Sequence, residues 1–296
     1  MEERFIDLSE EAVGLTVRLD QLVIKREQGE HTVPLEDLAA LVISHPAIHL
    51  SQAVLAGVAS HGGCVIVCDD KRLPIGLMLP ITAHYVQSEN IAAQVEAPAP
   101  LKKQLWKQVV RAKILAQARL LHLQFGRDFG LVRLAEQVKS GDTGNVEAQA
   151  SRAYWPALLG TQFRRIPGAT DPANRLLNYG YAVLRGVVGR AICAAGLHPS
   201  IGIHHHNRYD AFCLADDLME PFRPLVDAAV REILLENGSE APLDKETKAV
   251  LISALISKRF EAEGEARLLF DLLSRVAASL AQAFAGERKK LYLPEL

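Results

Sequence analysis

The sequence of 296 residues predicts an α+β fold, in which a small N-terminal β-sandwich domain precedes a larger all-α domain. Three observations support this prediction. Apolar and polar residues alternate in the first part, a proline-rich stretch follows, and apolar residues then recur every three or four positions. We place the β-sandwich at residues 1–82, a linker at 83–100 and the all-α domain at 101–296.

The first domain is expected to consist of short strands. Leu15, Val17 and Leu19 alternate with polar residues, which is the period of a half-buried strand. Further strands are expected at 22–26, 38–44, 64–68 and 75–79, and a short alanine-rich helix at 51–60. Because exposed edge strands favour pairing with another chain, we assign this domain to dimerisation.

The change from strands to helices is expected near the segment Gln94-Val-Glu-Ala-Pro-Ala-Pro-Leu. Proline interrupts regular structure and favours the first turn of a helix. Leu101, Leu105 and Val109 then begin an apolar stripe with helical spacing. Similar stripes start near positions 144, 172, 216, 243 and 261, so the helical part is large enough to bury its own core.

Composition limits the class of protein. Hydrophobic residues make up 49% and charged residues 23%, as in a packed rather than a disordered chain. Neither a signal peptide nor a long apolar run is visible, so we expect a cytoplasmic protein. The four cysteines form no C-x-x-C pair, which favours buried thiols over structural zinc. A net charge of −2 argues against histone-like binding to nucleic acid.

Two segments of the helical part carry candidate chemistry. Glu147 lies among small residues, which leave room for a large ligand, although a solvated glutamate near a helix start has the same pattern. The loop that contains His204, His205 and His206 could bind a transition metal or transfer protons near neutral pH. It could equally be a polar turn on the surface.

A third segment concentrates acids at the start of a helix. Asp216, Asp217 and Glu220 are favoured there by the helix dipole, but like charges one turn apart repel each other. A divalent cation would remove that repulsion, and carboxylates with one imidazole suit Mn²⁺ or Mg²⁺ better than zinc. Two other classes remain open: a metal-dependent hydrolase of small phosphoesters, and a non-catalytic helical scaffold in which these residues lie apart and solvated.

Basic residues predict where nucleic acid could bind. Lys103, Lys107 and Arg111 repeat every four residues on one helix face, within a stretch from 101 to 127 that has seven basic and no acidic residues. Such a face could hold phosphates, or it could simply be solvated. Other candidates are Arg152, Arg164 and Arg165 for DNA near Glu147, and Tyr154, Trp155, Tyr179 and Tyr181 for stacking on bases, although such aromatic residues are more often core.

Four blocks in one order resemble the CRISPR-associated spacer-acquisition integrases. They are Val146-Glu-Ala with Tyr154-Trp, Asp171-Pro-Ala-Asn-Arg-Leu-Leu-Asn-Tyr-Gly-Tyr, Gly202-Ile-His-His, and Leu214-Ala-Asp-Asp-Leu-Met-Glu-Pro-Phe-Arg-Pro. The resemblance covers nearly the whole chain. It is strongest to the variety that accompanies single-protein (type II) CRISPR effectors.

The resemblance implies a DNA endonuclease and integrase that depends on Mn²⁺ or Mg²⁺ and inserts captured DNA into a CRISPR array during antiviral adaptation. It implies a metal site of Glu147, His205 and Glu220, with Asp217 as a reserve ligand or a support for the ligands. His205 is chosen because the family pattern is Gly, two residues, then His. The implied assembly is a homodimer, two of which flank a dimer of a small ferredoxin-like partner in a heterohexamer on captured and leader–repeat DNA.

Overall fold

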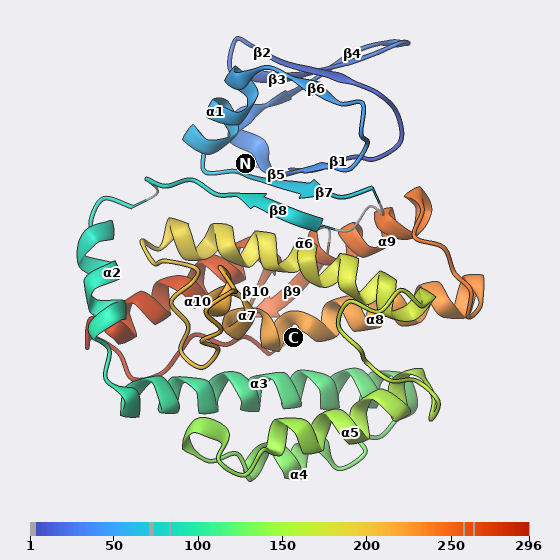
Figure 1. The fold of residues 1–296 in the computed structure, drawn as a ribbon. Coiled ribbons are helices and arrows are strands. Elements are labelled where there is room, and N and C mark those ends of the chain that lie inside the picture. Colours follow the sequence, from blue (N-terminus) through green and yellow to red (C-terminus); the bar gives the residue numbers. More distant parts are fainter. Residues whose placement is uncertain (1–3, 71–73, 83, 257, 263, 296) are drawn as a thin grey trace.

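The computed structural model describes residues 4–70, 74–82, 84–256, 258–262 and 264–295 (Figure 1). Residues 1–3, 71–73, 83, 257, 263 and 296, which fall within the three predicted segments, lie outside this part. The chain contains both sheets and helices, with the strands concentrated near the N-terminus. None of the helices in the described ranges is long and apolar enough to cross a membrane.

Two four-stranded sheets form the N-terminal part. The first has the order β1 (Arg4–Leu8), β5 (Leu38–Ile43), β7 (Cys64–Cys68) and β8 (Pro74–Met78). Its first three strands are parallel, and β8 is antiparallel to β7. The second sheet has the order β4 (Gly29–Pro34), β3 (Gln21–Arg26), β2 (Gly14–Arg18) and β6 (His49–Leu50). It is an antiparallel meander to which β6 adds in parallel.

A hydrophobic core lies between these sheets and α1 (Gln52–Ser60). Leu15, Leu22 and Leu41 are buried in it, and for Leu15 the alternation of apolar residues predicts this. Leu19 departs from the prediction: it follows the end of β2, has φ of 51° and is 90% exposed. The strand therefore ends earlier than the alternation of apolar residues suggests.

The helical part packs on one long helix, α6, whose other side lies against the first sheet. Within the described residues, the helices and 3₁₀ turns in addition to α1 are η1 (Leu35–Asp37), α2 (Gln87–Glu96), α3 (Ala99–Phe125), α4 (Leu131–Glu136), η2 (Ser140–Asp142), α5 (Val146–Leu159), α6 (Pro172–Ala194), α7 (Cys213–Met219), η3 (Glu220–Phe222), α8 (Arg223–Asn237), α9 (Lys245–Ile256) and α10 (Leu269–Phe284). In Figure 1, α6 runs between the first sheet and the remaining helices. A Cβ atom at Gly186 would lie 2.9 Å from Cδ1 of Ile66 in β7, so this glycine lets α6 pack directly on the sheet.

Two predictions about organisation are wrong. Residues 83–100 are not simply a linker, because they contain α2 and the start of α3. The C-terminal part is not all-α, because β9 (Arg259–Ala262) and β10 (Glu265–Leu268) form an antiparallel hairpin where a helical stripe was expected. In β9 the buried Phe260 lies between exposed neighbours, which is strand-like alternation, and Gly264 after it has a positive φ of 79° that suits a turn.

Candidate active site

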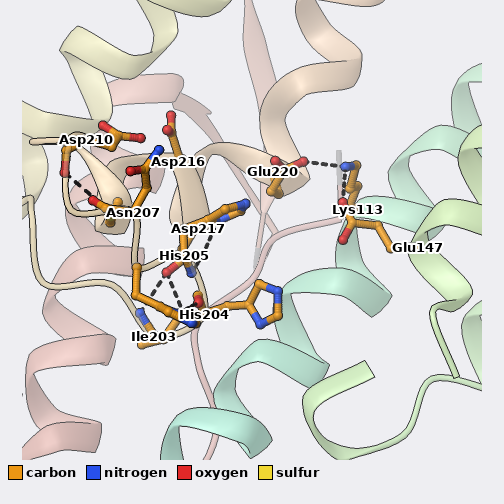
Figure 2. A network of polar contacts seen from close by, with 12 residues as sticks. Lys113, Glu147, Ile203, His204, His205, Asn207, Asp210, Asp216, Asp217 and Glu220 are labelled. Carbon is orange, nitrogen blue, oxygen red and sulfur yellow. Dashed lines mark hydrogen bonds and ion pairs between the residues drawn. The ribbon is translucent and has the colours of Figure 1, made fainter. Parts of the chain in front are cut away.

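The acids Asp216 and Asp217 of α7 and Glu220 of η3 do not converge on one point. Asp216 accepts hydrogen bonds of 2.7 and 2.8 Å from the guanidinium of Arg185 in α6. Asp217 binds the histidine loop, whereas Glu220 points toward α3 (Figure 2). The repulsion expected from their spacing is therefore offset by three separate partners. Of this segment and the histidine loop, only Glu220 and the His205 side chain held by Asp217 remain candidates for a metal site.

Asp217 is fully buried and holds the histidine loop in place. Its Oδ2 accepts hydrogen bonds from the backbone N–H groups of Ile203 (2.7 Å) and His204 (2.9 Å). Its Oδ1 accepts one from the backbone N–H of His205 (3.1 Å) and lies 2.7 Å from Nδ1 of the same ring. Because both oxygens are engaged, Asp217 does not fit the role of reserve ligand. It supports His205 and leaves the Nε2 atom of that ring for a ligand.

Gly202 gives a physical reason for the spacing of glycine and histidine in this loop. A Cβ atom there would lie 2.2 Å from the carbonyl oxygen of His205 and 2.8 Å from Oδ2 of Asp217. No side chain fits in that space, so the loop can close around Asp217 only with glycine at this position. The buried Trp106 of α3 supports the other side, since its ring stacks on His204 with centroids 4.2 Å apart.

Gln94 of α2 anchors the beginning of the same loop. Its side-chain amide donates hydrogen bonds to the carbonyl oxygens of His198 (2.9 Å) and Ile201 (2.7 Å). It also accepts one of 2.9 Å from the backbone N–H of His198, and Gln94 is fully buried. Local sequence gives no signal for this role, because the partners lie more than one hundred positions away.

We expect Gln94→Leu to lower the free energy of unfolding by about 3 kcal/mol, because three backbone groups lose their partners in a buried place. Urea denaturation measures the change. Gln137→Leu is the control, since Gln137 is exposed and a surface change of this kind shifts stability by about 0.5 kcal/mol at most. Equal effects of the two substitutions would contradict the anchoring role of Gln94.

Glu147 and Glu220 meet at Lys113. The Nζ atom of Lys113 lies 2.6 Å from Oε1 of Glu147 and 2.5 Å from Oε2 of Glu220 (Figure 2). The other oxygen of Glu220 lies 3.0 Å from Nε of Arg223. Helices α3 and α5 and the turn η3 thus bring two carboxylates to one cationic group. Lys113 belongs to the basic stretch of α3 but not to the face of Lys103, Lys107 and Arg111, and it is only 8% exposed.

The charges at this point are set by burial and by the neighbouring groups. Burial would raise the pKa of Glu220, but Arg223 and Lys113 together hold it below its ordinary value. Burial would lower the pKa of Lys113, but Glu220 and Glu147 raise it. Near neutral pH Glu220 is therefore a carboxylate and Lys113 an ammonium. The pKa of His205 is raised, first by its hydrogen bond with Asp217 and, among weaker causes, by the charge of Glu220.

Asp142 fixes the backbone at the start of α5, where Glu147 lies. Its Oδ1 accepts a 2.9 Å hydrogen bond from the N–H of Val146, and its Oδ2 accepts one of 3.0 Å from the N–H of Glu147. The preceding Asn145 has φ of 50°, a left-handed conformation that asparagine tolerates. This cap places the Glu147 side chain in the first turn of the helix, facing α3.

Three of the tyrosines proposed for base stacking belong to the core. Tyr154 donates a 2.6 Å hydrogen bond to Asp227, and Tyr181 donates a second one to the same carboxylate. Burial raises the pKa of Asp227 to about 6. Tyr179 donates to Asp7 at 2.9 Å. All three rings are buried, so the stacking hypothesis is wrong for them. Asp227 instead ties α5, α6 and α8 together beside the site.

The basic candidates differ in exposure. Lys103 and Arg111 are exposed on α3, and Lys107 is partly exposed. Arg152 and Arg164 are also exposed, whereas Arg165 is partly buried and donates hydrogen bonds to Ile166 O (3.0 Å) and Asn174 Oδ1 (2.9 Å). Arg165 therefore has a structural role in this conformation.

The fourth candidate for base stacking, Trp155, is partly buried against Tyr154 and Phe163.

The donor set fits a divalent cation, although its members do not form a finished site. Among the described residues, no three His, Cys, Asp or Glu side chains lie in the arrangement of a metal centre. Glu147 and Glu220, however, already point at one cationic group, the ammonium of Lys113. Carboxylate oxygens with one imidazole nitrogen are ligands that suit Mn²⁺ and Mg²⁺. Convergence of the two glutamates also argues against a scaffold in which each residue is solvated alone.

Comparison with known proteins gives consistent results. A model of the family described as "CRISPR associated protein Cas1" matches residues 8–263. The chain is 37% identical over 289 residues to the CRISPR-associated endonuclease Cas1 of Neisseria meningitidis serogroup C, covering 95% of this chain and 93% of that protein. It is 27% identical to a second such endonuclease, from Pyrobaculum aerophilum, covering 88% of this chain and 92% of that protein.

Solved structures share the fold. A casposase bound to an integration product has a TM-score of 0.78 at 20% identity and covers 98% of this chain and 92% of its own. A Cas1 protein from Thermotoga maritima has a TM-score of 0.75 at 19% identity, covering 97% and 98%. A chain of a Cas6-RT-Cas1–Cas2 complex has a TM-score of 0.76 at 19% identity, covering all of this chain and 36% of its own.

Proposed function

Because this chain belongs to the Cas1 family of CRISPR-associated proteins, we propose that it is a metal-dependent DNA endonuclease and integrase that inserts captured DNA into a CRISPR array. The Neisseria relative is named an endonuclease, and the casposase was solved with an integration product, which supports this assignment. The observation that carries it is the convergence of Glu147 and Glu220 on one cationic group, the ammonium of Lys113.

The reaction we propose is a transesterification. The 3′-hydroxyl of a captured DNA end attacks a phosphodiester at the leader–repeat boundary, so that one phosphodiester forms, one breaks and a new 3′-hydroxyl leaves. A Mn²⁺ or Mg²⁺ ion held by Glu147, His205 and Glu220 would offset the charge that develops on the phosphate. Asp217 keeps the His205 ring oriented, and Arg223 keeps one Glu220 oxygen in place.

The partners that we propose follow from the family. A chain with a similar fold occurs in a Cas6-RT-Cas1–Cas2 complex, which supports a small partner protein here. We propose a homodimer formed through the N-terminal sheets, two of which flank a dimer of a ferredoxin-like partner in a heterohexamer. DNA would run along the exposed face of α3 that carries Lys103, Lys107 and Arg111. Arg152 and Arg164 are exposed and would hold DNA nearer Glu147, whereas Arg165 would first have to release Asn174.

We expect the triple substitution of Lys103, Lys107 and Arg111 by Gln to weaken binding to duplex DNA. Each phosphate contact that is lost should reduce the slope of log affinity against log salt by about 0.9, so the slope should fall by about 2 to 3. Fluorescence anisotropy at several salt concentrations measures this. A matched triple substitution of Lys245, Lys258 and Arg259, all exposed, is the control. An unchanged slope would show that DNA does not follow this face of α3.

The chemistry is tested with a labelled donor DNA that ends in either a 3′-hydroxyl or a 3′-deoxy group. The purified protein is incubated with Mn²⁺, the donor, and a target that carries a leader–repeat junction, with and without the small partner. We expect a joined product only from the 3′-hydroxyl donor. Cutting without joining would restrict the activity to a nuclease. Hydrolysis of small phosphoesters, with DNA untouched, would favour the hydrolase alternative.

A further inference from the structure

The position of Lys113 has a consequence for how a cation enters the site. Its ammonium lies within 2.6 Å of both Glu147 and Glu220, between helices α3 and α5 and the turn η3. We propose that Lys113 is an internal counter-ion, which holds the two carboxylates together when no divalent ion is bound and competes with that ion for them. This inference rests on the proposed function, because it concerns the same two ligands.

The charges explain why an internal cation is needed. Glu220 is 5% exposed and the side chain of Glu147 is 27% exposed, so a buried negative charge lies close to a second one at the edge of the solvent. Arg223 contacts only one of the four carboxylate oxygens of this pair. A buried carboxylate without enough partners destabilises a fold strongly, so a second cation beside Glu220 stabilises the protein before it binds metal. Lys113 supplies it through two short charge-assisted contacts.

The same contacts oppose the binding of a metal ion. A divalent ion such as Mg²⁺ must approach its carboxylate oxygens to roughly 2.1 Å, which the ammonium of Lys113 prevents while it stays in place. A lysine can withdraw, because its charge is at the end of a flexible stem, whereas the planar guanidinium of an arginine holds carboxylates more rigidly. The apparent affinity for the metal ion is then the intrinsic affinity multiplied by the fraction of molecules in which Lys113 has withdrawn.

The test compares Lys113→Met with the wild-type protein by titration with Mn²⁺, using the electron paramagnetic resonance signal of free Mn²⁺. Methionine keeps the length of the stem and removes the charge. We expect Lys113→Met to bind Mn²⁺ about tenfold more tightly than the wild type. This is the change expected if Lys113 occupies the position in about 90% of wild-type molecules. Without divalent ions its melting temperature should lie below that of the wild type, and Mn²⁺ should raise it more than it raises that of the wild type.

Lys248→Met is the matched control. Lys248 is also buried, at 1% exposure, but it belongs to α9 and contacts Ser44 and the ring of Tyr179. Its substitution should lower the melting temperature without changing Mn²⁺ affinity. If Lys113→Met does not fold, Lys113→Arg replaces it, and we then expect Mn²⁺ to bind several times more weakly than to the wild type.

The outcomes separate this inference from the proposed function. Mn²⁺ binding by the wild type, with unchanged affinity in the Lys113 variant, would overturn the competition while leaving the metal site standing. If no variant binds Mn²⁺, the metal site itself is refuted, and the competition is refuted with it. Tighter binding by Lys113→Met, with Lys248→Met unchanged, is the result we expect.

Discussion

Glu220→Gln is expected to reduce strand transfer by a factor of roughly 10³, the scale on which removal of a fixed charge-stabilising group acts. Gln keeps the size of the side chain, but it removes the negative charge that faces Lys113 and Arg223. The proposed cation would then be held by Glu147 and His205 alone. A gel assay with a labelled donor DNA at saturating Mn²⁺ measures the rate.

Asp216→Asn is the matched control for this substitution. Asp216 lies four residues earlier on the same stretch, but its carboxylate pairs with Arg185 rather than with Lys113. We expect it to retain strand transfer within about threefold of wild type, although loss of a partly buried ion pair lowers stability. Melting temperatures of both variants separate loss of chemistry from loss of fold. Equal loss of activity in the two would mean that Glu220 has no special role.

Asp217→Asn is expected to reduce strand transfer by about 10² through its effect on His205, since groups that orient metal ligands contribute 10- to 100-fold. The amide nitrogen of Asn would face backbone N–H groups that now donate to the carboxylate. The loop would therefore lose both its anchor and the orientation of the imidazole.

A double-substitution cycle tests whether Asp217 acts through His205. We expect His205→Ala combined with Asp217→Asn to be no less active than His205→Ala alone, because the orientation of an absent ring has no further effect. If the two losses multiply, Asp217 contributes to the reaction independently of His205. Stability alone does not produce this pattern, provided that both single variants remain folded at the assay temperature.

The four sequence blocks, found in one order, were sufficient to identify the family. The match to the Cas1 family model confirms that identification. They also predicted that residues from α5, the histidine loop and the turn η3 belong to one site. Spacing alone could not have placed Glu147 beside Glu220, because the two are 73 positions apart and meet only through Lys113 of α3. That Lys113 is the residue between them follows only from how α3 packs against α5 and η3.

Lys113 could have been recognised from helical geometry. Of its four neighbours at three and four positions, Val109, Val110 and Gln117 are buried and Ala116 is partly exposed. Lys103, Lys107 and Arg111 follow a different face, since each residue turns a helix by about 100°. A lysine on an apolar face needs a buried partner, so Lys113 could have been set apart from the exposed basic residues of the same stretch.

Gln94 and the β9–β10 hairpin were missed for different reasons. Gln94 is preceded by ordinary helix-forming residues, and only distant backbone groups reveal what it binds. The hairpin has strands of four residues each. In so short a segment, the spacing of apolar residues does not distinguish a strand from the end of a helix. Local patterns therefore predicted the larger elements, whereas contacts between distant segments had to come from the structure.

The most direct test is a strand-transfer assay in which wild type, Glu147→Ala, His205→Ala and Glu220→Ala are each incubated with branched DNA and either Mn²⁺ or EDTA. Circular dichroism first establishes that every variant is folded. We predict joined product from the wild type with Mn²⁺, and none with EDTA or from any of the three variants. Activity that survives both Glu147→Ala and His205→Ala would contradict the proposed site and reduce the relationship with Cas1 proteins to one of fold.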